Sequence, residues 1–220
     1  MKYYSMVARE EEACPIGLCN AFLVPMYVKD VIRTEFGLHP WYAGPRRLDQ
    51  PLKDFPGGLV LITKDSDSLF DIKSGSAYFY IASSTFIDCL HGLTTNILQI
   101  EEVEYVNYQG VPIKGKKYYA FRTKKILKDV ALNLEKSSFH INSPRNFKNL
   151  VMKESLNLDV FDIAGLWPSK ITLVCSEKAK DIFCTKNIKG VSFVEIEKIV
   201  EPPSLNHGEL YAPMAHLSPI

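Results

Sequence analysis

A thiol stands where some enzymes place a nucleophile, at Cys175 in the stretch LVCSEKAKDIF (residues 173–183). The apolar run ends at this cysteine, a serine follows, and the spacing then becomes helical. A helix N-terminus can lower the pKa of a nearby thiol and make it reactive. A nucleophile also needs a base and an orienting group, and the scattered histidines give no sign of either. We therefore predict a buried structural thiol, and a hydrolase that uses Cys175 stays open as an alternative.

Two pairs of glutamates offer a second possible chemistry. Glu102 and Glu104 share one face of a predicted strand, and Glu195 and Glu197 share one face of another. Paired carboxylates can act as general acid and base, so they belong to the same hydrolase alternative. A solvated strand face is the more common cause of such a pair. An acidic face can also meet a basic partner surface, because opposite charges steer association.

The segment GVPIKGKK (residues 110–117) has the glycine and lysine spacing of a phosphate-binding loop. Such a loop needs a serine or threonine next, to hold magnesium, and then a helix. Lys117 occupies the position of the hydroxyl, and the following KYYAFR is typical of a strand. The sequence therefore predicts a hairpin turn here and no cofactor site.

Basic and aromatic residues are interleaved in KGKKYYAFRTKK (residues 114–125), a composition that can bind single-stranded nucleic acid. In a strand, however, alternate aromatic side chains face the core while the lysines sit at its ends. Over the whole chain, 26 basic residues balance 25 acidic ones and the net charge is +1. A nucleic-acid-binding module stays an alternative, but the overall charge favours neither nucleic acid nor an anionic membrane as partner.

The cysteines and histidines are too scattered for a predicted zinc site. The five cysteines contain no Cys-x-x-Cys pair, and their odd number argues against a disulfide framework. The N-terminal stretch carries the acidic cluster Glu10 to Glu12 where a secretory signal would need an apolar region. We predict a cytoplasmic protein with no catalytic, metal or cofactor residues.

The elements that must position these residues are mostly strands. Apolar runs and period-two alternation predict strands at 3–7, 22–28, 59–63, 77–82, 97–106, 117–122, 158–163, 171–175 and 191–199. Helical spacing predicts short helices at 85–90 and 177–184, residues 127–134 fit a strand or an amphipathic turn, and residues 137–149 are typical of a polar loop. Residues 37–58, rich in proline and glycine, predict a connecting segment. Together these elements predict an α+β fold with mixed, mostly antiparallel sheets and short helices.

The domain organisation follows from the same pattern. With 220 residues, of which 46% are hydrophobic, the chain can bury a sizeable core as one large domain or two small lobes. We predict an N-terminal β-rich lobe with an irregular leader (1–125), a C-terminal α/β lobe (126–200) and a Pro-rich tail (201–220).

Two segments of the chain resemble each other. In YIASSTFIDCL (residues 80–90) and LVCSEKAKDIF (residues 173–183), an apolar run ends in a small residue, a serine follows, and an aspartate comes five residues later. A strand with Val-Glu, at 103–104 or 194–195, comes after each. We predict that Ser83 and Ser176 each cap a short helix, which is worth about 1 kcal/mol relative to alanine. Two related strand–helix–strand lobes would follow, although the sequence alone leaves open whether the repeat is genuine.

Residues 57–198, with these two units, the strand KYYAFR and the turn GLWPS, resemble the immunity proteins of bacterial polymorphic-toxin systems. That group includes the immunity proteins of type VI secretion and related contact-delivered toxins. The resemblance implies an α+β fold and a non-catalytic protein that binds and blocks a cognate toxin, encoded by an adjacent gene. Inhibitors of nucleic-acid-cleaving toxins are often strongly acidic, and the charge balance of this chain departs from that pattern.

A contact region for such a toxin can be suggested from composition alone. The turn at residues 108–116 and the Pro-rich tail are both expected to be exposed. Within the turn we predict Tyr108, Gln109, Lys114 and Lys116 as partner-contact residues.

Overall fold

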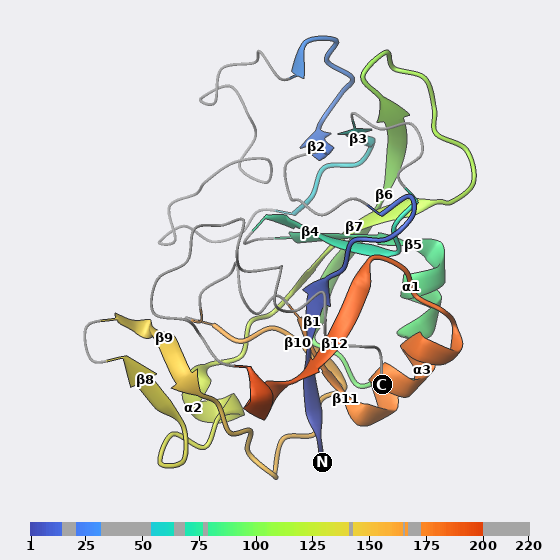
Figure 1. The fold of residues 1–220 in the computed structure, drawn as a ribbon. Coiled ribbons are helices and arrows are strands. Elements are labelled where there is room, and N and C mark those ends of the chain that lie inside the picture. The colour runs from blue at the N-terminus through green and yellow to red at the C-terminus, as the bar shows by residue number, and fades with distance from the viewer. Residues whose placement is uncertain are drawn as a thin grey trace.

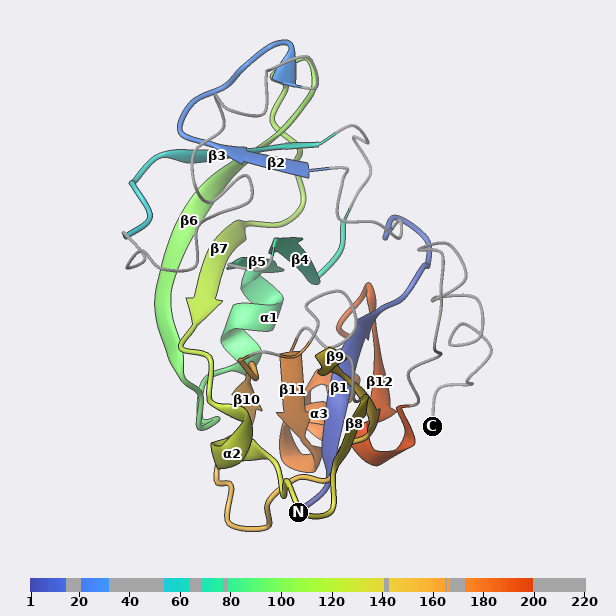
Figure 2. The same ribbon diagram turned by 90° about the vertical axis from the view of Figure 1, so that its left-hand side faces the viewer.

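The computed structural model describes residues 1–14, 21–31, 54–63, 69–76, 79–140, 143–164, 166 and 173–199. Within these residues ten of the twelve strands form two sheets, which lie one above the other in Figure 2. The larger sheet has the order β2 (Ala21–Val24), β3 (Leu59–Thr63), β6 (Ile97–Asn107), β7 (Tyr118–Thr123), β5 (Phe79–Ser83), β4 (Ile72–Ser76). The smaller sheet has the order β10 (Val160–Phe161), β11 (Leu173–Ser176), β1 (Tyr3–Ala8), β12 (Val191–Glu195).

Short helices and a hairpin complete the described fold. The helices are α1 (Ser84–Cys89), α2 (Lys128–Ala131) and α3 (Glu177–Thr185), and a 3-10 turn, η3 (Ile196–Lys198), follows β12. The hairpin pairs β8 (Ser138–His140) with β9 (Ser143–Asn149). β3 and β6 pair in parallel, and the other named strand pairs are antiparallel. The predicted α+β class, with mixed and mostly antiparallel sheets, is confirmed.

The two sheets contain the same four-stranded unit. The strand order β4-β5-β7-β6 with α1 after β5 matches the order β10-β11-β1-β12 with α3 after β11. The strand beside the serine-ended strand begins with Tyr-Tyr directly after a lysine in both sheets, at residues 117–119 and 2–4. Its first tyrosine lies opposite the serine each time, Tyr118 opposite Ser83 and Tyr3 opposite Ser176. The similarity between the two segments is therefore a structural repeat.

The second repeat takes one of its strands from the N-terminus of the chain. The first repeat is continuous in sequence, β4-β5-α1-β6-β7, whereas the second has β10-β11-α3-β12 and receives β1 in the place of β7. β1 lies between β11 and β12, hydrogen-bonded to both. The division into lobes at 1–125 and 126–200 stays a prediction, and β1 belongs by its pairing to the sheet of the later residues.

The serine caps are confirmed in both repeats. The Oγ of Ser83 accepts a hydrogen bond from the N–H of Phe86 at 3.3 Å, and that of Ser176 accepts one from the N–H of Ala179 at 3.2 Å. The two Val-Glu dipeptides, in contrast, are not equivalent. Tyr119 pairs with Glu102 and the equivalent Tyr4 pairs with Glu195, so the register matches Glu102, rather than Glu104, to Glu195.

Each repeat holds a buried aspartate directly before its first strand. The carboxylate of Asp71 accepts from the hydroxyl of Ser83 at 2.5 Å, and that of Asp159 accepts from the hydroxyl of Ser176 at 2.6 Å. The backbone carbonyl of each aspartate also accepts the N–H of its serine, at 2.8 Å in both repeats. The capping serine of each helix is thus held by two hydrogen bonds to the aspartate that directly precedes the neighbouring edge strand.

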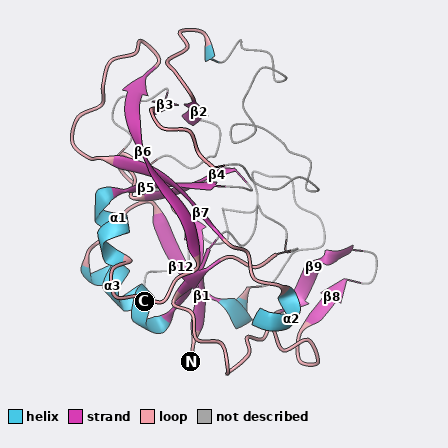
Figure 3. Ribbon diagram, turned by 180° about the vertical axis from the view of Figure 1, so that it is seen from behind, coloured by secondary structure: helices cyan, strands magenta, loops and turns pink. Residues whose placement is uncertain are grey.

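The two repeats meet through their helices. Figure 1 shows α1 and α3 side by side, and Figure 3 shows the same pair from behind. The rings of Phe86 and Phe183 stack with centroids 5.0 Å apart, and Phe86 also stacks against Phe121 of β7. All three rings are fully buried, in a core that draws on both sheets and includes Cys175.

Several predicted elements are confirmed, and four differ. The predicted strand at 191–199 ends at Glu195, and Glu197 lies in η3, so the prediction that Glu195 and Glu197 share a strand face is wrong. β3 has the predicted bounds, and residues 127–134, left open between strand and turn, contain α2. The predicted strand at 22–28 ends at Val24, because Pro25 cannot donate to a ladder. The predicted strand at 158–163 is reduced to Val160–Phe161. The predicted loop at 137–149 is wrong: it forms the β8–β9 hairpin, where Phe139 pairs with the buried Phe147. Most of the connecting segment 37–58 and all of the tail 201–220 lie outside the described residues.

Candidate partner-binding site

The turn between β6 and β7 contains all four predicted contact residues, and hydrogen bonds hold its backbone in place. The side-chain oxygen of Asn107 accepts from the N–H groups of Gln109 and Val111, both at 2.9 Å. The N–H of Asn107 donates to the carbonyl of Val111 at 3.0 Å, and Gly110 has a φ of 77°. The predicted hairpin turn is therefore confirmed. A strand, rather than the helix of a phosphate-binding loop, follows it.

A second loop braces this turn. The hydroxyl of Tyr27, in the loop after β2, donates to the carbonyl of Tyr108 at 2.7 Å. A Cβ at Gly110 would lie 2.9 Å from the ring of Tyr27, so only a glycine lets the ring approach this closely. The two loops extend from the same end of the larger sheet (Figures 1 and 2). The sequence analysis missed Tyr27, because its contact joins residues 81 positions apart.

Large apolar side chains are exposed on the braced loops. Met26 is 67% exposed, Val111 56% and Tyr27 38%, and we call these three residues the apolar tip. Of the predicted contact residues, Gln109 and Lys114 are exposed and Tyr108 is half-buried. Apolar groups gathered on an ordered surface are typical of protein-binding sites. The tip therefore has the chemistry of a protein contact.

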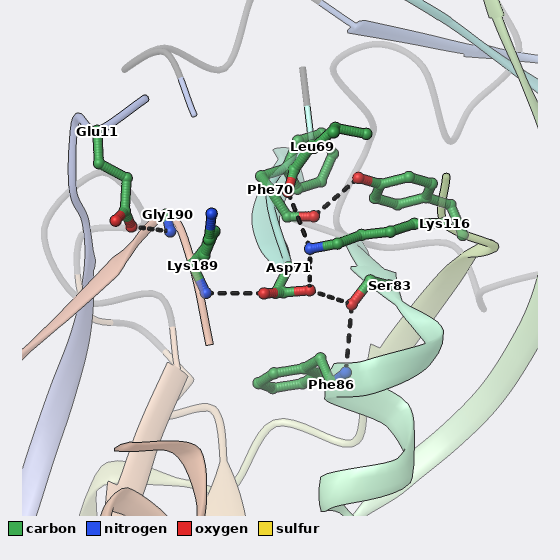
Figure 4. Close-up of polar contacts among 10 residues, drawn as sticks. Glu11, Leu69, Phe70, Asp71, Ser83, Phe86, Lys116, Lys189 and Gly190 are labelled. Atoms are coloured by element: carbon green, nitrogen blue, oxygen red, sulfur yellow. Dashed lines mark hydrogen bonds and ion pairs between the residues drawn. The ribbon is translucent and has the colours of Figure 1, made fainter. Parts of the chain in front are cut away.

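Lys116, the fourth predicted contact residue, points into the molecule. Its Nζ lies 2.6 Å from Oδ1 of Asp71 and 3.0 Å from the carbonyl oxygen of Leu69, and only 22% of the side chain is exposed. Figure 4 shows this ammonium group beside Asp71, whose other partners include Ser83 and the N–H of Lys189. An ion pair with a buried carboxylate ties the end of the turn to the first repeat.

The geometry around Cys175 does not suit a nucleophile. The residue is 0% exposed, and burial raises the pKa of its thiol above the ordinary value. A catalytic cysteine needs the opposite shift and an open approach.

One glutamate of each predicted pair is engaged in an ion pair. Glu102 lies 3.5 Å from Nζ of Lys117, and Glu195 lies 2.7 Å from Nζ of Lys198. The hydrogen bond from Lys198 lowers the pKa of Glu195, whereas a general acid needs a raised pKa. Among the described residues, no group of three or more His, Cys, Asp and Glu side chains could hold a metal ion.

The aromatic residues in the basic segment 114–125 are not available to stack on bases. Tyr118 and Phe121 are fully buried, and Tyr119 is half-buried. Arg122 is also buried, and its guanidinium pairs with Asp54 at 3.1 Å. This segment therefore lacks the exposed stacking surface that single-stranded nucleic acid requires.

A comparison with known families identifies the family of the chain. The family model described as Immunity protein 43 matches residues 21–202 of the chain. The chain belongs to this family. The apolar tip and all four predicted contact residues lie inside the part that matches Immunity protein 43, whereas β1 precedes it. A comparison with curated proteins finds no match. Among the described residues, no helix is long and apolar enough to cross a membrane.

Proposed function

We propose that this protein binds a cognate bacterial toxin and neutralises it by non-covalent inhibition. Membership of the Immunity protein 43 family is the observation that carries the proposal. Such a protein needs a binding surface and no catalytic machinery of its own. The buried, high-pKa thiol of Cys175 and the ion-paired glutamates are consistent with a binder.

In this proposal the apolar tip is the anchor for the toxin. Binding energy at protein interfaces concentrates in a few aromatic and large apolar side chains held in place before binding. Tyr27 is held by its hydrogen bond to Tyr108 and by its contact with Gly110, so little of its freedom is left to lose. Gln109 and Lys114 flank the tip and would form a polar rim. In this proposal Lys116 supports the turn through Asp71.

The setting that we propose is interbacterial competition. The toxin is encoded by the adjacent gene and delivered by a type VI or related contact-dependent system, and the immunity protein acts in the cytoplasm. Because the net charge is +1, inhibition does not depend on an acidic chain that imitates nucleic acid.

Co-expression tests this function directly. The product of the adjacent gene is induced in a sensitive bacterium, alone or together with this protein. We expect growth arrest in the first case and recovery in the second, and a stable complex of the two purified proteins. A product that is harmless alone, or that kills despite this protein, would overturn the proposal.

Catalytic neutralisation is tested in the same experiment. A Cys175→Ala variant should rescue growth as well as the wild type, provided that it folds. Loss of rescue in a folded Cys175→Ala variant would instead support the hydrolase alternative.

A further inference from the structure

β6 exposes one of its faces although it lies inside the larger sheet. The strand pairs with β3 on one side and with β7 on the other. Leu98 is 55% exposed and Ile100 41%, the side chain of Glu102 is 59% exposed, and Glu104 is exposed as well. Since alternate residues of a strand point to one side, Ile100, Glu102 and Glu104 form a single row. A bulge between Ile97 and Gln99 interrupts the alternation, and the exposed Leu98 lies in this bulge at the end of the row. We call this row the outer face of β6.

The opposite side of β6 is occupied, so the exposure is specific to one face. The amide of Gln99 accepts from the N–H of Phe55 at 2.9 Å and donates to its carbonyl at 3.4 Å. A Cβ at Gly57 would lie 3.6 Å from Oε1 of Glu101. Residues 55–57 therefore cover the side on which Gln99 and Glu101 lie, while the outer face stays open to solvent.

The composition of the outer face changes along the strand. Leu98 and Ile100 make an apolar end, and Glu102 and Glu104 make an acidic end. The only cation paired with either carboxylate in the described ion pairs is Lys117, at 3.5 Å from Glu102, and that lysine is itself 71% exposed. An exposed ion pair of this kind contributes little to stability, and a cation from a partner can replace the lysine. The acidic end can therefore accept cations from a partner.

The outer face continues towards the apolar tip. From Leu98 to Glu104 a strand rises about 20 Å, which approaches the width of a standard protein interface. Further along the strand comes Val106, buried against the loop after β2, and directly after β6 comes Tyr108, whose carbonyl accepts from Tyr27. One partner could thus contact the tip and the outer face together.

We propose that the outer face of β6 is a second contact surface for the toxin, and that the toxin presents cationic side chains beside apolar ones there. This inference rests on the proposed function and names the chemistry of the partner. Charge complementarity selects this occupant: a second copy of the chain would bring its own Glu102 and Glu104 to the interface, where like charges repel.

Binding kinetics with matched variants test the inference. The probe is the purified product of the adjacent toxin gene, titrated against this protein at low and at high salt. Leu98→Arg alters the apolar end and Glu104→Lys the acidic end, while Leu134→Arg and Glu135→Lys place the same changes on the exposed turn after α2. We expect Leu98→Arg to weaken binding about tenfold or more, because it replaces with a charge an apolar side chain that the toxin would bury in the complex. Glu104→Lys should slow association about tenfold at low salt and much less at high salt, because salt screens electrostatic steering.

The outcomes separate the outer face from the proposed function. If the wild type neither binds nor rescues, the proposed function itself fails. If the wild type binds and both outer-face variants behave like their controls, the function stands and this inference is wrong. If the free wild type is a dimer that Leu98→Arg converts to a monomer, the outer face contacts a second copy and the inference is again overturned. Each variant is accepted only if its thermal midpoint stays close to that of the wild type.

Discussion

Asp71 and Asp159 stand at equivalent positions of the two repeats and make the same four hydrogen bonds. Two of these join each aspartate to the capping serine of its own repeat. The other two hydrogen bonds join each aspartate to a residue of the other repeat. The carboxylate of Asp71 accepts the N–H of Lys189 at 2.8 Å, and its own N–H donates to the carbonyl of Lys189 at 3.0 Å. Asp159 makes the matching pair with Thr94, at 2.9 and 2.7 Å.

This crossover fastens the two repeats together. Lys189 precedes β12 in the second repeat, and Thr94 precedes β6 in the first. Each aspartate is buried and therefore needs its hydrogen bonds. Reciprocal exchange satisfies both carboxylates and fixes the two sheets relative to each other on either side of the α1–α3 contact.

Removing either capping serine should destabilise the whole fold. Ser83→Ala and Ser176→Ala each remove a helix cap and a hydrogen bond to a buried carboxylate, so we expect each to lower the free energy of unfolding by about 1–3 kcal/mol. Urea denaturation of each variant measures its free energy of unfolding. Ser138→Ala, at an exposed position of β8, is the control and should change stability by less than about 0.5 kcal/mol. Equal effects at all three serines would contradict the role of the aspartates.

The stability contributed by Asp159 should disappear in acid. Burial alone would raise the pKa of its carboxyl, but the hydrogen bonds from Ser176 and Thr94 and the charge of Lys178 outweigh burial and lower the pKa. Because the folded pKa lies below the ordinary value of 3.8, the ionised group stabilises the fold above that value. This contribution is lost as the pH falls through the lower folded pKa.

Urea denaturation of the wild type and of Asp159→Asn, between about pH 7 and pH 2.5, measures the contribution. We expect the variant to be less stable at neutral pH and to lose less stability on acidification. Asp181→Asn, on the exposed side of α3, is the control and should follow the wild type. A wild type and an Asp159→Asn variant that lose the same stability in acid would refute the linkage.

Deletion of β1 should unfold the second repeat, although β1 precedes the part of the chain that matches Immunity protein 43. β1 is an inner strand, and Tyr3 is 3% exposed with its hydroxyl donating to the carbonyl of Leu156 at 2.7 Å. We expect Tyr3→Ala to cost about 3–5 kcal/mol, as for other large buried aromatic residues. Lys2→Ala, at the exposed position directly before β1, should cost almost nothing. Native-like circular dichroism and an unchanged thermal midpoint after removal of residues 1–8 would show that β1 is dispensable.

Local signals in the sequence were sufficient for much of this fold. The continuous apolar run of β3 and the serine before each helix act over a few residues, and both were predicted correctly. The β8–β9 hairpin was missed because polar residues surround its pairing phenylalanines, so neither alternation nor an apolar run is visible. The aspartate crossover and the position of β1 depend on which strands pair, and a local pattern carries no information about that choice.

In the candidate site, too, local features were predictable and contacts between distant residues were not. The exposed turn was predicted from its glycines and proline, and the structure places Gln109 and Lys114 at the surface. The contribution of Tyr27 was not predictable, because a tyrosine next to a proline and a methionine has no local reason to pack on a glycine of another hairpin. The burial of Lys116 likewise depends on Asp71, which is 45 residues away in sequence.

Lys114 and Lys116 should separate toxin contact from structural support. Lys116→Met leaves a buried carboxylate without its cation, so we expect it to lower the free energy of unfolding by a few kcal/mol. Lys114→Met should leave stability unchanged because Lys114 is exposed. Denaturation curves and toxin affinity, measured on both variants, distinguish the two roles. A Lys116→Met protein that keeps its stability but loses affinity would make Lys116 a direct contact.

The apolar tip gives the sharpest test of toxin binding. Val111→Asp places a charge on an exposed apolar position, and we expect at least about tenfold weaker binding to the product of the adjacent gene without loss of stability. Tyr27→Phe keeps the ring against Gly110 but removes the hydrogen bond to Tyr108, so it should weaken binding less than Tyr27→Ala does. Leu127→Asp, at a 61% exposed position beside α2, is the control. If Val111→Asp and Leu127→Asp bind equally well and rescue growth equally, the toxin does not contact the tip.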